Sequence, residues 1–174
     1  MSNLKYWLWL TSRVGVSGQG MAELLSHFGT PESAYFADRH AYESVAGLSE
    51  KARRSFQDKS LSRVDQILGD CDRLGIRIMT IQDAIYPERL RAIHQPPLVL
   101  YWKGRDIAVD NEAAVAVVGT RSATPYGVRI AEQLGLDLTR AGALVVSGIA
   151  EGIDAAAVRG ALKAGGPVIS VLGG

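Results

Sequence analysis

Two stretches of sequence decide the fold of this chain: AVVGTRSATPYG at residues 116–127 and VVSGIAEGID at residues 145–154. Each runs from an apolar segment into a loop of small residues and then into a segment with helical spacing. The pattern predicts three strands with two helices between them, at 115–118, 126–140, 144–146, 154–164 and 168–172. Because the strands are apolar throughout, we expect an α/β unit with a parallel sheet covered on both faces.

The two loops of small residues are the candidate binding site. Both leave the carboxyl edge of the predicted sheet, where ligands of such folds bind. Glycine lets the backbone approach a ligand closely, the helix that follows offers unpaired N–H groups, and an arginine can direct two hydrogen bonds at one phosphate. The alternative is an ordinary tight turn with a surface arginine. The sequence predicts a phosphate-binding site made of Gly119, Thr120, Arg121, Ser147, Gly148 and Gly152.

Two acidic residues beside these loops have two interpretations each. Asp154 lies at the start of a predicted helix, where it is either an N-cap or a ligand contact. Glu151 is either a general base or a solvated loop charge, and the second is favoured because no histidine or second carboxylate accompanies it. The histidines at 27, 40 and 94 all lie outside the loops. We therefore expect no catalytic residues, and a binding protein rather than an enzyme.

Cofactor and metal sites are not supported by the sequence. The first strand is not followed by G-x-G-x-x-G, the second ends in Ser147-Gly148 rather than an acidic residue that would bind a ribose, and there is no P-loop. Cys71 is the only cysteine, which excludes an internal disulfide and a cysteine-type zinc site. We expect no cofactor, no metal and a reducing, cytoplasmic location.

Composition describes a globular chain without an overall charge bias. Of the 174 residues, 47% are hydrophobic and 21% charged, with 19 basic against 18 acidic side chains. This balance excludes a uniformly basic nucleic-acid coat, so any anion must meet a local patch. No apolar run approaches the length of a membrane span, and we expect no membrane partner.

The segment before residue 110 has the pattern of a helical module. Two hydrophobic-glycine-hydrophobic turns, at 14–18 and 45–49, each precede a predicted helix and are typical of tandem helix-hairpin-helix units. Such turns can offer backbone N–H groups to DNA phosphates. Ser17 and Ser49 stand where a second glycine is usual, which favours a structural role.

A longer amphipathic helix and two strands are predicted next. Apolar residues at helical spacing between 61 and 74 indicate the helix, with Ser60 as its N-cap, Gly75 as its C-cap and Cys71 buried on its apolar face. Strands are predicted at 76–81 and 98–102, where they would extend the sheet of the following unit.

The final predicted strand runs into two glycines, Gly173 and Gly174, at which the sequence stops. In an α/β fold such a strand normally feeds a loop and a covering helix. We therefore expect a fragment or a truncated gene product.

Several of these segments together closely resemble the DNA processing protein A family, DprA/Smf. The resemblance is carried by Val118-Gly119-Thr120-Arg121 with Tyr126-Gly127, by residues 147–154, by Gly160-Ala161-Leu162 and by residues 86–104 with Leu100-Tyr101-Trp102-Lys103-Gly104. The helical start is similar to that family's SAM-like, helix-hairpin-helix domain. The resemblance implies a helical SAM-like domain at 1–74 and the first half of an extended Rossmann-like DNA-binding domain at 75–174.

Members of that family are non-catalytic mediators that bind single-stranded DNA and load the RecA recombinase onto it during natural transformation. The resemblance therefore implies single-stranded DNA and RecA as partners, a homodimer in the full-length protein, and a phosphate pocket at the two loops. One departure is Val158, where the family usually has a histidine.

Two other hypotheses remain open at this stage. The same fold superfamily contains small-nucleotide-binding proteins and nucleotide-processing enzymes, although nothing after Val115 reproduces their Gly-Gly-Gly-Thr loop with a following Glu. The remaining hypothesis is an unstable remnant without activity, because half a sheet exposes its strand edges.

Overall fold

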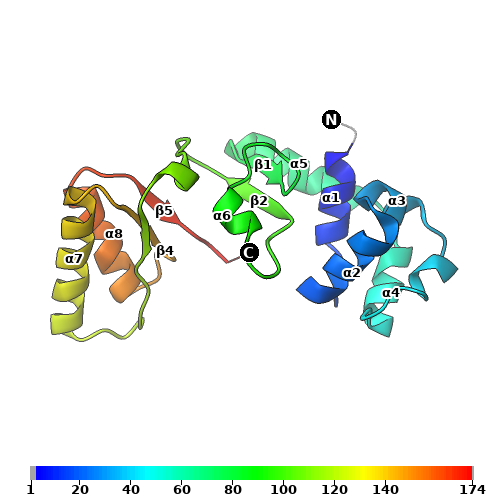
Figure 1. The fold of residues 1–174 in the computed structure, drawn as a ribbon, viewed down its shortest axis with the longest axis horizontal. Coiled ribbons are helices and arrows are strands. Elements are labelled where there is room, and N and C mark those ends of the chain that lie inside the picture. The colour runs from blue at the N-terminus through cyan, green and yellow to red at the C-terminus, as the bar shows by residue number, and fades with distance from the viewer. Residues whose placement is uncertain (1–2, 174) are drawn as a thin grey trace. The chain divides into compact units, whose positions relative to one another are not determined.

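The computed structural model describes residues 3–173 and divides into two compact units, Met1–Asp106 and Ile107–Gly174 (Figure 1). Each unit has its own hydrophobic core. Among the described residues, no helix is both long enough and apolar enough to cross a membrane.

The first unit is mainly helical. Its helices are α1 (Leu4–Thr11), α2 (Gly18–Phe28), α3 (Pro31–Phe36), η1 (His40–Tyr42), α4 (Glu50–Gln57), α5 (Ser62–Leu74) and the short α6 (Glu88–Arg91). Three of them begin at a hydroxyl side chain that accepts a hydrogen bond from the first turn: Ser17, Thr30 and Ser49. This capping explains why serine rather than glycine occupies positions 17 and 49.

Aromatic rings fill the core of the helical unit. Trp9 and Phe56 are fully buried and their ring centroids lie 5.7 Å apart. The ring of Tyr42 stacks on Phe56 at 5.4 Å with an interplanar angle of 7°. Because α1, η1 and α4 each contribute one of these rings, the cluster joins segments that are distant in sequence.

The two predicted glycine turns lie against each other. Gly15 and Gly47 have φ of 76° and 74°, in the left-handed region that favours glycine. The Ser49 hydroxyl donates to the Gly15 carbonyl at 3.2 Å, so the second turn is bonded to the first. The structure thus gives both turns a packing role.

Helix α5 differs from its prediction at one end. Cys71 is buried, and Gly75 adopts the left-handed conformation expected of a C-cap. Ser60 is not the N-cap, however: Leu61 holds that position, and the Ser60 hydroxyl instead accepts from the Ser62 N–H at 3.3 Å. The Asp58 side chain accepts from the Ser60 N–H and so forms a turn just before the helix. The helix therefore begins later than predicted.

The strands β1 (Arg77–Thr80) and β2 (Val99–Trp102) pair with each other, antiparallel, as a two-stranded sheet. The prediction that they extend the sheet of the following unit is therefore wrong for the described residues. Ile78 and Val99 pack against the helical core, so burial of these side chains accounts for their place in the first unit.

The second unit contains the predicted parallel sheet. Its elements are η2 (Val109–Asn111), β3 (Ala114–Ala116), α7 (Pro125–Arg140), β4 (Leu144–Ser147), α8 (Ile153–Lys163) and β5 (Val168–Ser170). The strand order is β3-β4-β5 and both pairings are parallel, with Ala116 opposite Val146 and Val146 opposite Ile169. The predicted α/β class and βαβαβ order are confirmed.

Covering of this sheet on both faces is not observed among residues 107–173. Val117, Val145 and Val168 face α8, where they pack with Ala157 and Ala161. Both crossovers step in the same direction across the sheet, and since such connections are right-handed, α7 and α8 lie on one face. Val118 and Val171, which follow β3 and β5, are 69% and 62% exposed.

Helices α7 and α8 approach each other through glycine. A Cβ on Gly160 would lie 1.9 Å from the Glu132 carbonyl oxygen, and one on Gly135 would lie 2.0 Å from that of Ala157. Backbone therefore packs directly on backbone between the two helices. Glu132 also forms ion pairs with Arg159 and Lys163 across this contact.

Candidate anion-binding site

The two predicted loops follow β3 and β4, which are neighbours in the sheet. Their residues lie at 117–124 and 148–152. Because β3 and β4 run parallel, both loops leave the same edge, at the beginnings of α7 and α8. The structure thus brings together five of the six predicted site residues in the two loops, and the sixth, Ser147, is the last residue of β4.

Asp154, in the first turn of α8, joins the two loops. Its Oδ1 accepts from the Gly119 N–H at 2.9 Å, and its Oδ2 accepts from the Gly148 N–H at 3.2 Å. The side chain is buried. The interpretation of Asp154 as an N-cap is wrong, because Gly152 holds that position and Asp154 reaches backward to the loops.

The glycines of the site permit this close packing of loops. Gly152 has φ of 86°, and a Cβ there would lie 2.2 Å from the Thr120 carbonyl oxygen. A Cβ on Gly119 would lie 2.7 Å from that of Ile153. The Ile153 N–H donates to the Thr120 carbonyl at 3.2 Å. The first loop therefore rests on the N-terminus of α8, an arrangement that any larger residue at 152 would block.

Ser147 has a structural bond at the end of β4. It is 2% exposed, and its hydroxyl donates to the Val117 carbonyl at 2.8 Å. This bond continues the link between β3 and β4 beyond their paired residues. The hydroxyl of Ser147 is thus already used, and its part in holding a phosphate stays a prediction.

The solvent side of the site is formed by Thr120 and Arg121. Both are exposed, and within residues 3–173 the Arg121 guanidinium has no ion-pair partner. The Thr120 hydroxyl accepts from the Ser122 N–H at 3.2 Å and keeps its own proton available for donation. Helix α7 begins directly afterwards, capped by Thr124, and directs its positive dipole end toward this region. These groups can bind an anion.

The distribution of charged side chains in the second unit also favours anion binding at Arg121. Between 107 and 174 the chain carries five basic and six acidic residues, so an anion must meet a local cation. Arg159 and Lys163 are paired with a glutamate on α7, so neither adds free positive charge. Arg129 and Arg140 lie on α7 beyond its first turn. Arg121 is therefore the cation best placed for a ligand at the loops.

Ile149 was not singled out by its sequence, yet it is the unusual backbone position of the site. It has φ of 50°, in the left-handed region, and its side chain is 45% exposed. For a β-branched residue, this backbone conformation costs on the order of 1–3 kcal/mol. Residues under such strain are concentrated at binding sites. The only signal in the sequence is its position between two glycines of one loop.

Tyr126 adds an aromatic side chain to this edge. It lies at the second position of α7 and is 66% exposed. An exposed ring beside an anion site is a surface on which a nucleic-acid base can stack.

One acidic side chain, Glu151, lies in the second loop. Glu151 is exposed, as expected of a solvated loop charge. Within the described part of the chain, no three His, Cys, Asp or Glu side chains form a group that could hold a metal ion. What the arrangement provides is a rigid pair of loops with hydrogen-bond donors on its outer side.

Comparison with known proteins relates this chain to one family along most of its length. The family model for DNA recombination-mediator protein A matches residues 77–174. Protein Smf from Synechocystis sp. is 32% identical over 99% of this chain and 44% of its own length. DNA processing protein DprA from Bacillus subtilis is 33% identical over 64% of this chain and 38% of its own length. This chain therefore spans less than half of these curated relatives.

The fold has a counterpart among solved structures. The X-ray structure of DNA processing protein A from Streptococcus pneumoniae matches with a TM-score of 0.70 and 24% sequence identity. The match covers 97% of this chain and 57% of the other. It supports the helical module followed by a Rossmann-like parallel sheet.

Proposed function

We propose a function from the premise that this chain belongs to the DNA recombination-mediator protein A family: it binds single-stranded DNA in recombination. The observation that carries the proposal is the unpaired Arg121 on a loop that Asp154 holds rigidly against the start of α8. Arginine recognises phosphate through paired hydrogen bonds. Gly119, Thr120 and Arg121 would contact the strand, and Ser147, Gly148 and Gly152 would form the opposing wall.

Side chains near the loops suit a single strand rather than a duplex. Tyr126 and Ile149 are exposed apolar groups beside the donors. Unpaired bases present faces that can stack on such groups, whereas the bases of a duplex are already stacked on each other. In this proposal the donors hold the backbone and Tyr126 contacts a base.

The wider role that we propose follows the family. The chain would act as a cytoplasmic, non-catalytic mediator that delivers the bound strand to the RecA recombinase, and the full-length protein would be a homodimer. We also propose that the boundary between the SAM-like and Rossmann-like domains of the family lies near residue 75, where the family match begins at 77, even though β1 and β2 pack within the first compact unit.

The test is fluorescence anisotropy of a labelled single-stranded oligonucleotide at several salt concentrations. Arg121→Ala is expected to weaken binding about tenfold and to lower the salt slope by about one. Arg140→Ala is the matched control, because it removes the same charge at the far end of α7. Equal losses in both variants would contradict a site at the loops. Duplex DNA and mononucleotides as competitors distinguish a strand-binding protein from a nucleotide-binding one.

Asp154 supplies a second test that removes no DNA contact. Asp154→Asn turns one acceptor into a donor that faces a backbone N–H, which costs about 1–3 kcal/mol. We expect faster hydrogen exchange at Gly119 and Gly148, together with weaker binding of the oligonucleotide. Asp137→Asn is the control, since the Asp137 carboxylate accepts from the exposed Gln133 side chain and touches neither loop in residues 3–173. Faster exchange with unchanged affinity would show that binding does not depend on the loop geometry.

A further inference from the structure

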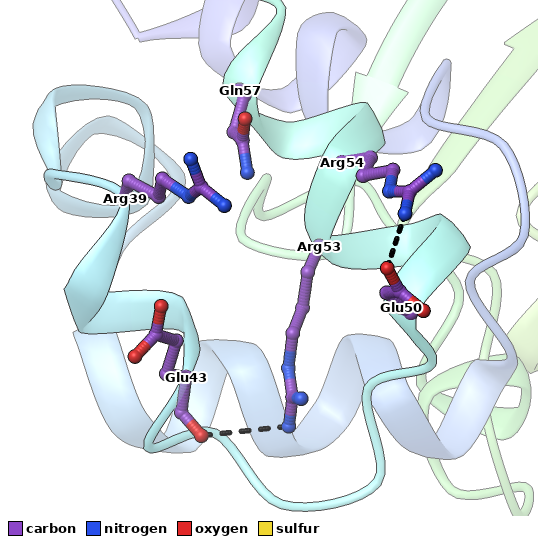
Figure 2. A pocket seen from close by; sticks show the side chains of 6 residues that line it. All are labelled: Arg39, Glu43, Glu50, Arg53, Arg54 and Gln57. Atoms are coloured by element: carbon purple, nitrogen blue, oxygen red, sulfur yellow. Dashed lines mark hydrogen bonds and ion pairs between the residues drawn. The ribbon is translucent and has the colours of Figure 1, made fainter.

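A cavity on the helical unit, remote in sequence from the two loops, is lined by three arginines. Its volume is about 380 Å³, and it is bounded by Arg39, Glu43, Glu50, Arg53, Arg54 and Gln57. Figure 2 shows these side chains arranged around an opening, with Arg39 extending into it from one side and Arg53 lying on the other. The volume is sufficient for a phosphate and part of the group attached to it.

The three arginines differ in their partners. Arg54 forms an ion pair with Glu50, one turn earlier on α4. Arg39 is exposed and has no hydrogen bond or ion pair within the described residues. Arg53 reaches the carbonyls of Glu43 and Val45 only at 3.4 and 3.5 Å. Arg39 and Arg53 are thus the guanidinium groups without a carboxylate.

Arg53 also holds a donor that nothing among residues 3–173 satisfies. Its Nε is shielded from solvent and has no hydrogen-bond partner. A buried polar group without a partner costs about 1–3 kcal/mol, so such groups are rare unless a ligand or a water completes them. This donor lies on the side chain that borders the cavity, opposite Arg39 (Figure 2).

The charge of the cavity indicates what it accepts. Three guanidinium groups face two carboxylates, which leaves one positive charge. Glu43 Oε1 lies 3.5 Å from Nδ1 of His40, an exposed side chain. A phosphodiester carries one negative charge and several acceptor oxygens, and it matches this excess. A phosphomonoester, with nearly two charges, would exceed it.

We infer that the cavity between Arg39 and Arg53 is a second anion site, which binds a phosphodiester of a nucleic-acid strand. Only the choice of nucleic acid rests on the proposed function; the anion site rests on the two guanidinium groups. The second glycine turn, at 45–49, is adjacent, because Arg53 contacts the carbonyl of Val45 at its start. A strand bound here would contact the side chains of Arg39 and Arg53 and not the N–H groups of the turn.

The test is an NMR titration that follows the arginine Nε–H signals of the whole 174-residue chain. The probes are a short oligothymidylate, inorganic phosphate and a phosphoserine peptide. We expect the signals of Arg39 and Arg53 to shift saturably with the oligonucleotide, while Arg54 changes little because Glu50 already pairs with it. Tighter binding of inorganic phosphate or of the phosphopeptide would overturn the assignment to a nucleic-acid strand.

Variants make the test quantitative. Arg39→Ala is expected to raise the Kd reported by the Arg53 signal about tenfold, and Arg54→Ala to change it less than about twofold. An unchanged Kd in Arg39→Ala would overturn the inference. Arg39 is exposed, so its loss should leave the fold intact, and the backbone amides of α4 verify this. Arg121 reports the loop site in the same spectra. A silent Arg121 with responding Arg39 and Arg53 contradicts the loop site of the proposed function, whereas a responding Arg121 with silent Arg39 and Arg53 contradicts only this inference.

Discussion

The two units of this protein fill their interiors with side chains of opposite size. In Met1–Asp106 the core contains Trp9, Tyr42 and Phe56, whereas the contact between α7 and α8 in Ile107–Gly174 is closed by Gly135, Gly160 and alanines. The single aromatic residue of the second unit, Tyr126, is exposed. In the second unit, small side chains allow backbone segments to pack directly against each other. This close packing holds the loops in position.

Tryptophan offers a convenient probe of the difference between the units. All three tryptophans lie in the first unit, at positions 7, 9 and 102. Tryptophan fluorescence therefore follows the unfolding of that unit, while circular dichroism follows the helices of both. Variants in either unit can be compared within one protein.

The largest effect is expected from removing a ring. Phe56→Ala deletes a fully buried side chain that stacks on Tyr42 and contacts Trp9, so it should cost about 3–5 kcal/mol. Denaturant unfolding followed by tryptophan fluorescence should show the loss. Phe36→Ala is the control, since Phe36 is 69% exposed. Similar losses in both variants would contradict a core centred on Phe56.

The opposite change should damage the second unit. Gly160→Ala adds a methyl group that collides with the Glu132 carbonyl, and separating the helices should cost about 1–3 kcal/mol. The circular dichroism transition of that unit is expected at lower denaturant, with the tryptophan transition unchanged. Gly69→Ala in α5 is the control: apart from its chain neighbours and the nearby backbone of α5, no described atom lies within 4 Å of its added Cβ, so helix propensity should raise stability by about 0.5–1 kcal/mol. A neutral Gly160→Ala would show that the helices can separate without cost.

The smallest effect concerns a lysine beside the aromatic core. Lys59 Nζ lies 4.9 Å from the ring centroids of Trp9 and Tyr42, and burial, with a lesser effect of Arg13, lowers the pKa of Lys59 to about 8. Between that pKa and the unfolded value of about 10.4, the unfolded chain binds more protons, so stability should rise with pH. We expect about 1 kcal/mol, because solvent partly screens the amine.

The measurement is the unfolding free energy from about pH 7.5 to about pH 9.5, by tryptophan fluorescence. The upper limit avoids Tyr42, whose pKa burial raises to about 12, so that its ionisation in the unfolded chain reduces stability above about pH 10. Lys59→Met should remove the rise. An equal rise in the variant would assign it to another group.

Much of the fold follows from the sequence by local rules. Apolar runs ending in small residues specified the strands and helices of the second unit, and Gly75 marked the end of α5 through its left-handed conformation. The pairing of β1 with β2 was not specified locally. Both segments are typical strands, and only the burial of Ile78 and Val99 against the helical core assigns them to the first unit.

The candidate site was predicted as a set of residues but not as an arrangement. Glycines at 119, 148 and 152 are visible in the sequence, and their neighbours suggested a ligand. The structure shows that these glycines also make room for loop-to-loop contacts. The role of Asp154 could not be predicted, since its two partners lie 35 and 6 residues away.

By itself the sequence determined the α/β class, the βαβαβ order along the chain and the position of the Gly-Thr-Arg loop, because periodicity and turn chemistry act over a few residues. Tertiary structure decided which groups remain free. It engages the N–H groups of Gly119 and Gly148 and the hydroxyl of Ser147, and it leaves Arg121 exposed. The physical reason is that a hydrogen-bonding group is free or engaged according to what folding brings within about 3 Å of it, and that distance is not a property of local sequence.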